Sequence, residues 1–157
     1  MALYFAYGSN MRSARLAQRI GRARAIGAVH VSGWSLRFDK PGRDGTGKAN
    51  LVEAPGVQAW GVAYAVPQGA WPRLDRFEPG YRREQFRLVA SDGRTLDALA
   101  YLYPSSPPAR EALPSSADGL STLSPSPEYL AHLLDGAREH GLPDHWLETI
   151  RSAARVG

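Results

Sequence analysis

Cysteine is absent from this chain of 157 residues, and lysine is nearly so. Without cysteine there can be no disulfide, no thiolate nucleophile and no sulfur ligand for zinc or an iron–sulfur cluster. Any chemistry therefore depends on oxygen and nitrogen groups. Lysine occurs only at Lys40 and Lys48, although lysine and arginine together number 19.

Long apolar runs are also missing. Glycine, proline or a charged residue interrupts each run before it reaches the roughly 18 residues that span a bilayer. The segment from Met1 to Gly8 has neither the basic start, the long apolar stretch nor the small-residue cleavage site of a signal peptide. We therefore expect a soluble, cytoplasmic protein with no membrane partner.

Charge of one sign is not concentrated in any segment. The net charge of +4 and the pI of about 9.7 would suit a nucleic-acid partner. However, the arginines are scattered from Arg12 to Arg155, and acidic residues stand among them, as in Arg82-Arg83-Glu84. Phosphate binding requires clustered cations. The pattern favours a solvated basic surface and predicts no nucleic-acid partner.

The composition fits one hydrophobic core. Hydrophobic residues make up 43% of the chain and charged residues 22%, which argues against a disordered protein. A chain of this length has room for one sizeable core and little room for a second. We expect a single domain over residues 1–157.

The first part of the chain predicts a strand, a tight turn and a helix. Leu3 to Tyr7 is an apolar, aromatic run that ends at Gly8. Ser9 or Asn10 can cap a helix that runs to about Ile20.

From Ala23 to Tyr103 the pattern is rich in strands separated by Gly, Pro and Asp turns, and several neighbouring pairs are typical of antiparallel hairpins. A short helix, Ala70 to Phe77, interrupts the series and ends at Glu78-Pro79-Gly80. The expected strands are Ala25 to Gly33, Trp34 to Asp39, Ala49 to Glu53, Val57 to Val66, Gln85 to Ala90 and Thr95 to Tyr103.

The last part of the chain predicts two helices. Pro104 to Pro127 is rich in Ser and Pro and is expected to be a surface excursion. Tyr129 to Ala137 has helical spacing, and a second helix begins at Pro143 with apolar residues on one stripe. The fold class is α+β, with a curved or barrel-like antiparallel sheet and helices against one side and one end.

Gly42 to Lys48 matches the first part of a phosphate-binding P-loop, Gly-x-x-x-x-Gly-Lys. The next residue, Ala49, has no hydroxyl for a magnesium ion, and the following residues predict a strand where a P-loop needs a helix. We interpret the segment as a glycine-rich hairpin loop.

Histidine and serine chemistry have little support. His30, His132, His140 and His145 lack the spacing of a metal-binding pair, and a solvated surface explains them at least as well as catalysis. No serine stands in a Gly-x-Ser-x-Gly motif. We therefore expect no metal site and no serine triad.

Two local features remain. At Tyr7-Gly8-Ser9-Asn10 a strand ends in a glycine turn before a helix, so backbone N–H groups converge into a possible anion or oxyanion pocket. An ordinary turn with Asn10 as helix cap explains the same residues equally well.

Glu78 is a lone carboxylate at a helix end, where most carboxylates are solvated. Nearby aromatic residues would remove water from it and raise its pKa towards that of a general base. Arg82 and Arg83 would lower it, and the sequence leaves this balance open. The aromatic residues concerned are Phe77, Trp60, Trp71 and Tyr81.

Four segments, in this order, resemble the γ-glutamylcyclotransferase family (AIG2-like), and the resemblance covers nearly the whole chain. The last segment is more similar to the γ-glutamylcyclotransferase branch than to the glutathione-specific or γ-glutamylamine-specific branches. The segments are Tyr4 to Met11, Gly47 to Leu51 with Trp60-Gly61-Val62, Leu74 to Glu78, and Ser126 to Tyr129 leading to Gly136 to Pro143.

The resemblance implies a small antiparallel β-barrel flanked by helices, with the active cavity at one mouth and no cofactor. It implies that the enzyme cyclises γ-glutamyl amino acids, or related γ-glutamyl amides, to 5-oxoproline and releases the amino acid or amine. Pro79 stands where relatives often have glycine, so the rim of the leaving-group pocket is expected to differ. The implied residues are Glu78 as general acid and base, and Tyr7, Gly8, Ser9, Asn10, Met11 and Tyr129 as substrate-binding residues.

Alternatives remain open at this stage. A relative specialised for glutathione, a γ-glutamylamine or a biosynthetic γ-glutamyl intermediate would carry similar motifs. A binding module without turnover would keep the fold, because a fold does not guarantee a function. The expected partner is a small γ-glutamyl substrate, and the protein is expected to be a monomer or homodimer.

Overall fold

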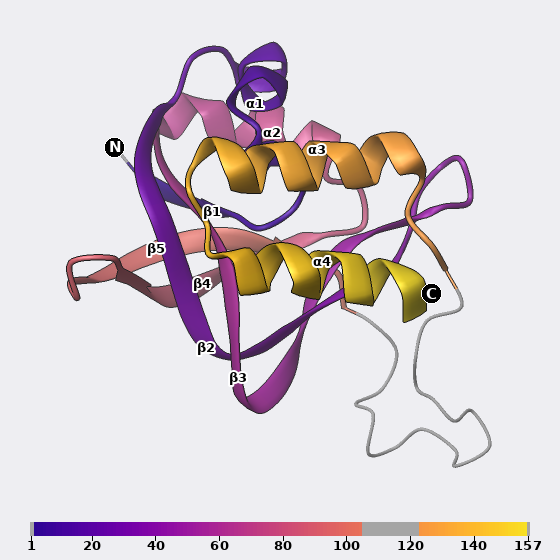
Figure 1. Ribbon diagram of the computed structural model, residues 1–157. Helices are drawn as coiled ribbons and strands as arrows, with labels where there is room; N and C mark the ends of the chain where they lie inside the picture. The colour runs from indigo at the N-terminus through magenta and orange to yellow at the C-terminus, as the bar shows by residue number, and fades with distance from the viewer. Residues whose placement is uncertain (1, 105–122, 157) are drawn as a thin grey trace.

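Five strands close into a barrel, and helices cover one side and one end of it (Figure 1). The computed structural model describes residues 2–104 and 123–156. The arrangement confirms the expected α+β class. The strands are β1 (Ala2–Ala6), β2 (Arg24–Pro41), β3 (Gly47–Val66), β4 (Arg82–Ala90) and β5 (Thr95–Leu102), in the order β1-β3-β2-β4-β5 around the barrel.

The long hairpin of β2 and β3 replaces the four separate strands expected from the sequence. Gly33 has a φ of +89°, which lets β2 change direction without ending. Residues 54–57 of β3 bulge out, since Glu53 and Gln58 pair with Trp34 and Ser32. Glycine and proline in these segments therefore bend the strands instead of separating them.

The barrel is antiparallel except at one seam. β1 pairs with β3 in antiparallel fashion, from Ala2 opposite Val66 to Ala6 opposite Val62. On its other edge β1 meets β5 in parallel, through Tyr4 and Leu99. The expected antiparallel β-barrel is therefore confirmed, with this one parallel contact added, because closing an odd number of strands requires one parallel pair.

The helix expected from Ser9 or Asn10 to Ile20 is divided in two. Arg12 has an extended ψ of 117°, which ends the 3-10 turn η1 (Ser9–Met11) before α1 (Ser13–Ile20) begins. A second 3-10 turn, η2 (Gln68–Ala70), leads into α2 (Trp71–Phe77), which ends just before Glu78 as predicted.

The C-terminal helices are α3 (Pro127–Glu139) and α4 (Asp144–Val156). Figure 1 shows them side by side across the barrel, with α1 and α2 together at its upper end. Most of the expected excursion from Pro104 to Pro127 lies outside the described residues. No helix within the described ranges is both long and apolar enough to cross a membrane.

The side of the barrel under α3 fixes the position of the turn after β1. Gly136 of α3 lies so close to this turn that a Cβ atom there would be 2.7 Å from the Cβ atom of Met11 and 2.6 Å from the backbone nitrogen of Arg12. Met11 is fully buried, as is Leu133 one helical turn before Gly136. Close packing of α3 on η1 therefore holds the turn against the barrel.

Candidate active site

A cavity of about 480 Å³ opens at the barrel end covered by α1 and α2. Its wall combines the turn after β1, the tip of the β2–β3 hairpin, the end of α2 and one residue of α3. This volume is within the range of small-molecule sites. Of the residues implied by the resemblance, Tyr7, Gly8, Ser9, Asn10, Glu78 and Tyr129 line the cavity.

The turn after β1 lines the cavity with Gly8, Ser9 and Asn10. The turn's own hydrogen bonds run from Met11 N to Gly8 O (3.1 Å) and from Arg12 N to Ser9 O (3.3 Å). The first N–H groups of a 3-10 turn have no partner within that turn, which here applies to Ser9 and Asn10. N–H groups of this kind can bind an anion.

Glycine at position 8 has close neighbours. A Cβ atom on Gly8 would be 3.2 Å from the Cβ atom of Ala49 and 3.3 Å from the hydroxyl of Tyr129. A larger side chain would push the turn away from β3 or fill the cavity.

Asn10 does not cap a helix, which corrects the alternative interpretation of this residue. Its side chain is buried and forms no cap hydrogen bond. Its Nδ2 donates to the Tyr4 hydroxyl (3.0 Å) and to Glu78 Oε1 (3.4 Å), and its Oδ1 accepts from Arg19 Nη1 (3.2 Å). Ser9 is fixed similarly, since its Oγ accepts from Arg15 Nε at 2.8 Å.

Tyrosines form much of the cavity wall. Tyr129 accepts a hydrogen bond from Ala49 N (2.9 Å), and Tyr81 donates one to Ala49 O (2.7 Å). Tyr7 donates from its hydroxyl to the carbonyl of Tyr101. Both Tyr7 and Tyr129 are buried. The rings are therefore fixed by directional bonds to the backbone of the barrel.

Glu78 follows the last turn of α2 and directs its carboxyl group into the cavity. Removal from water raises the pKa of Glu78 to about 7, although Arg19, Lys40 and Arg15 each lower it. This value is close to neutral pH, where a carboxyl group can both accept and return a proton. Glu78 is half-buried in the cavity wall and accepts a hydrogen bond from Asn10, so it differs from an ordinary solvated helix-end carboxylate.

The neighbours of Glu78 differ in part from those expected. Arg82 and Arg83 are not among the cations that lower its pKa; they form ion pairs with Glu84 (2.7 Å) and Asp75 (3.3 Å). Phe77 is 46% exposed, so it contributes little to the removal of water.

Trp60, also expected near Glu78, instead packs against His30, with 4.7 Å between the ring centroids and 48° between the ring planes. Trp71 contacts the cavity indirectly, with its ring edge-on to Tyr4. Tyr81 lines the cavity with Glu78 as expected, and Tyr4, Tyr7 and Tyr129, which were not among the expected neighbours, line it too.

Met11 does not line the cavity, which corrects its assignment as a substrate-binding residue. Its side chain is 0% exposed and lies in the core against α3. Its carbonyl accepts a hydrogen bond from the hydroxyl of Tyr64 at 2.7 Å. Met11 anchors the turn from behind.

The glycine-rich segment is a hairpin loop, as interpreted from the sequence. Gly42 N bonds to Thr46 O (2.8 Å), and Gly45 has a φ of +82°. Lys48 stands within β3, not at the start of a helix. The loop nevertheless contributes to the cavity wall.

Surface solvation does not describe His140. Its side chain is 10% exposed, and its Nε2 lies 3.2 Å from Ser13 Oγ and 3.1 Å from the Tyr64 hydroxyl. The nearby Glu139 carboxylate also approaches Nε2, at 3.5 Å, whereas a catalytic triad needs it at Nδ1. These contacts of His140 join α1, β3 and the end of α3.

Within the described part of the chain, no group of three or more acidic or His side chains is placed to hold a metal ion.

The sequence did not lead us to expect Arg15 and Arg19 at the cavity, although their helical spacing is a signal that could have indicated them. They stand four residues apart, with Arg12 three residues before Arg15, and these spacings place side chains on one face of a helix. That face follows directly after the conspicuous turn. The place of Tyr4 in the cavity wall was also not predicted, because its position in the apolar run of β1 is typical of an ordinary strand residue.

Known proteins share sequence similarity with this chain over most of its length. A family model described as gamma-glutamyl cyclotransferase, AIG2-like, matches residues 4–119. The gamma-glutamylcyclotransferases of Homo sapiens and Bos taurus are each 26% identical to this chain, over 96% of its length and 77% of theirs. The chain belongs to the gamma-glutamyl cyclotransferase, AIG2-like family.

Solved structures support the same fold. A crystal structure of a human protein titled uncharacterized superposes with a TM-score of 0.81 at 25% identity, covering 96% of this chain and 86% of that one. A structure titled gamma-glutamyl cyclotransferase gives 0.77 at 24% identity, with the same coverage. A yeast structure titled as specific to glutathione gives 0.59 at 13% identity, over 97% of this chain and 96% of that one. The last two likenesses show the fold alone.

Proposed function

We propose that this protein cyclises the γ-glutamyl group of γ-glutamyl amino acids, or related γ-glutamyl amides, to 5-oxoproline and releases the free amino acid or amine. The observation that carries the proposal is the position of Glu78, a carboxyl group with a pKa of about 7 in a cavity that also contains the turn after β1. Family membership supports the same reaction.

The substrate contains both reacting groups. Its α-amine attacks its own γ-carbonyl carbon, a C–N bond closes a five-membered lactam, and the original amide C–N bond breaks. Holding the chain in a folded conformation therefore provides much of the catalysis. In this proposal the N–H groups of Ser9 and Asn10 stabilise the oxyanion of the tetrahedral intermediate.

Glu78 moves the protons. Its carboxylate accepts a proton from the α-ammonium group, which frees the amine to attack. As the intermediate collapses, Glu78 returns that proton to the leaving nitrogen. A second proton passes the same way, so the lactam nitrogen keeps one hydrogen and the released amine becomes an ammonium ion. Glu78 ends as it began.

Asn10 positions Glu78 in this scheme. Its Nδ2 bonds to one carboxylate oxygen of Glu78 and leaves the other oxygen to the substrate. Arg19 holds the Oδ1 of Asn10 at 3.2 Å, which fixes the orientation of the amide. The pair of contacts explains why a buried asparagine is useful here.

The test is to incubate the purified protein with γ-glutamyl dipeptides, glutathione and γ-glutamylamines and to measure 5-oxoproline by mass spectrometry. We expect 5-oxoproline together with one equivalent of free amine from at least one γ-glutamyl dipeptide. Binding of these compounds with no 5-oxoproline from any of them would identify a binding module instead. Turnover of glutathione alone would favour the glutathione-specific alternative.

A further inference from the structure

The only two lysines of the chain face each other at the cavity. The strand register places Lys40 of β2 directly opposite Lys48 of β3, and both residues line the cavity wall. Like charges directly opposite one another on a sheet are destabilising. A bound anion would offset the repulsion between the two ammonium groups. The paired lysines therefore indicate a site for a negatively charged ligand.

Each lysine lies over a tyrosine ring of the same wall. Lys40 Nζ is 5.4 Å from the ring centroid of Tyr81, and Lys48 Nζ is 4.6 Å from that of Tyr129. The hydroxyls of these two tyrosines bond to the carbonyl and the N–H of the same residue, Ala49. The two ammonium groups are therefore placed by a fixed aromatic platform and cation–π contacts.

The two lysines have few close acidic partners. Lys48 has one carboxylate nearby, Asp44 at 3.7 Å, which is 55% exposed and also accepts hydrogen bonds from Thr46. Lys40 has no carboxylate within ion-pair distance among residues 2–104 and 123–156. Arg43 adds a further cation to the cavity wall. Burial lowers the pKa of Lys40, and the charges of Lys48 and Arg43 lower it further, whereas Glu78 raises it.

We propose that Lys40 and Lys48 form a carboxylate-binding subsite for the leaving group, and that it selects γ-glutamyl peptides whose released amino acid has an acidic side chain. The inference rests on the proposed function. Every γ-glutamyl amino acid carries one α-carboxylate on its leaving part, which occupies one ammonium group. Glutamate or aspartate supplies a second carboxylate for the other ammonium group. A neutral amino acid leaves that second lysine without a partner.

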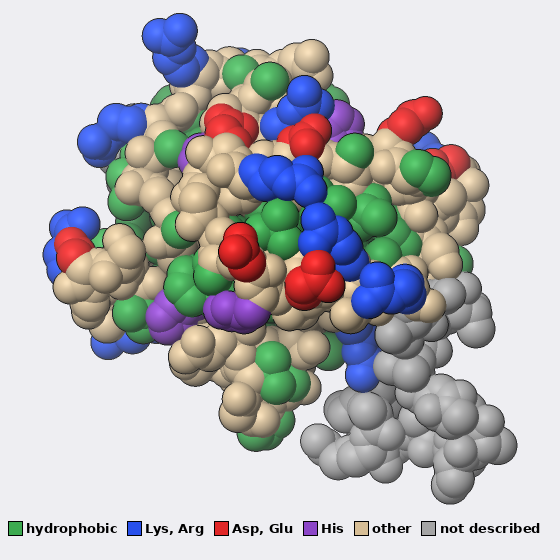
Figure 2. Space-filling model, in the orientation of Figure 1, with side chains coloured by type: hydrophobic (Ala, Val, Ile, Leu, Met, Phe, Trp, Pro, Cys, Tyr) green, Lys and Arg blue, Asp and Glu red, His purple; other side chains and the backbone are tan. Residues whose placement is uncertain are grey.

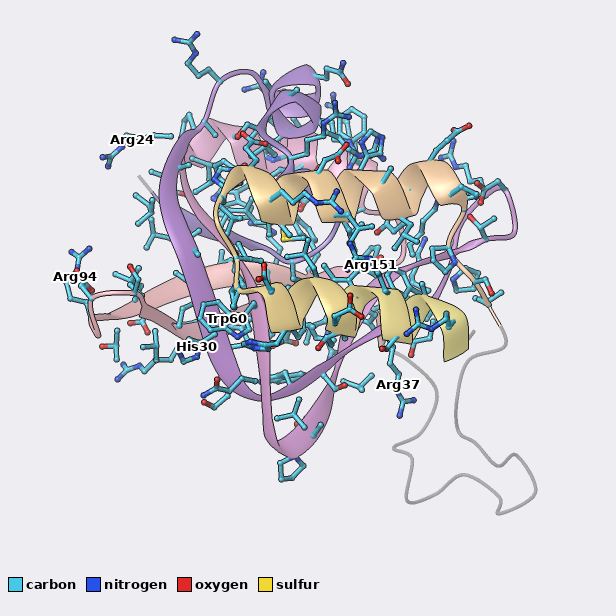
Figure 3. The ribbon with its side chains drawn as sticks, viewed as in Figure 1. Arg24, His30, Arg37, Trp60, Arg94 and Arg151 are labelled. Carbon is cyan, nitrogen blue, oxygen red and sulfur yellow. The ribbon has the colours of Figure 1, made fainter. Side chains whose placement is uncertain are left out.

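The experiment compares two substrates of nearly equal size, γ-glutamylglutamate and γ-glutamylglutamine. In the wild-type protein we expect kcat/KM to be about tenfold higher for γ-glutamylglutamate, the size of effect that one charge-assisted hydrogen bond gives. In the Lys40→Met/Lys48→Met variant the ratio should fall to about one. The matched control is Arg24→Gln, which removes a positive charge far from the cavity; Figure 3 shows Arg24 directed away from the barrel.

The outcomes separate this inference from the proposed function. Equal kcat/KM values for the two peptides in the wild-type protein overturn the subsite but leave the cyclisation intact. A ratio that falls as much in Arg24→Gln as in the lysine variant shows a general field effect and also overturns it. No 5-oxoproline from any peptide overturns the proposed function, and the subsite with it.

A second measurement needs no variant that could fail to fold. The preference for γ-glutamylglutamate in the wild-type protein should decrease when ionic strength rises from about 0.05 M to 0.5 M, because salt screens partly exposed charges. A preference that does not change with salt would show that shape, not charge, distinguishes the peptides, and would overturn the subsite.

Discussion

Two aromatic regions of the barrel differ in whether the polar atoms of their rings form hydrogen bonds. At the cavity, the hydroxyls of Tyr4, Tyr7 and Tyr129 each have a hydrogen-bond partner. On the flank, by which we mean the contact of Trp60 with His30, the two rings pack together at a tilt (Figure 3). Trp60 Nε1 and His30 Nδ1 are nevertheless buried without a hydrogen-bond partner in the described part of the protein.

The difference shows what each region is built to do. Directional hydrogen bonds fix atoms in place, which a reacting geometry needs. Ring packing alone fills space and contributes to stability without fixing a polar atom. Substitutions at the cavity should therefore change catalysis, whereas substitutions on the flank should leave it nearly unchanged.

The largest effect is expected from Glu78→Gln, which keeps the size of the side chain but removes its ability to accept a proton. We expect kcat to fall by about 10²- to 10⁴-fold, or roughly 3–5 kcal/mol of transition-state stabilisation. Steady-state kinetics with a γ-glutamyl dipeptide measure this, and KM should change little. A nearly normal kcat would show that another group carries the proton.

Tyr129→Phe should have an intermediate effect on the cavity. The change leaves the buried N–H of Ala49 without its partner, which costs about 1–3 kcal/mol. We expect the free energy of unfolding to fall by that amount in urea titrations, with a lower kcat/KM because Ala49 adjoins Gly8. An unchanged free energy of unfolding would mean that the hydroxyl serves only the substrate.

The raised pKa of Glu78 also predicts a dependence of stability on pH. Folding raises this pKa from 4.5 to about 7, so the fold disfavours the ionised group. The cost is absent below about pH 4.5 and complete above about pH 7. We therefore compare the unfolding free energy of Glu78→Gln with that of the wild type at each pH. The difference should favour the variant by about 1–2 kcal/mol more at pH 8 than at pH 4, a figure that allows for solvent screening. Thermal or urea unfolding at the two pH values checks this, and an equal difference at both would contradict it.

The smallest effect is expected from Trp60→Phe on the flank. The indole N–H has no partner to lose, so we expect kcat and KM to stay within about twofold of the wild type, while stability decreases modestly. The same assay used for Tyr129→Phe makes the comparison direct. A large loss of kcat would show that the flank positions the cavity and would remove the distinction between the two regions.

Much of the fold was predictable because local patterns dominate it. The end of α2 at Phe77 follows from Pro79 and Gly80, and the hairpin at Gly42 to Lys48 follows from its glycines. The continuity of β2 and β3 was not predictable, because glycine and proline in a strand either end it or bend it, and the choice depends on its neighbours.

The site was predictable where residues adjoin a conspicuous turn or helix end, as with Gly8 and Glu78. The roles of Lys40 and Arg19 were not, because their approach to Glu78 depends on how distant segments pack. Met11 shows the opposite error. Its place in the motif suggested a binding residue, but α3 covers its side chain completely. Figure 2 shows acidic side chains standing among the Lys and Arg side chains of this face, in line with the mixed charges of the sequence.

The most direct test of the account is the pH dependence of kcat/KM for γ-glutamylglutamine, measured from pH 5 to pH 7.5 in the wild type and in Glu78→Gln. The account predicts that kcat/KM of the wild type rises with pH as Glu78 loses its proton, with an apparent pKa of about 7, and that the residual activity of Glu78→Gln lacks this rise. The same rise in both proteins, or a flat profile in the wild type, would contradict Glu78 as the group that moves the proton.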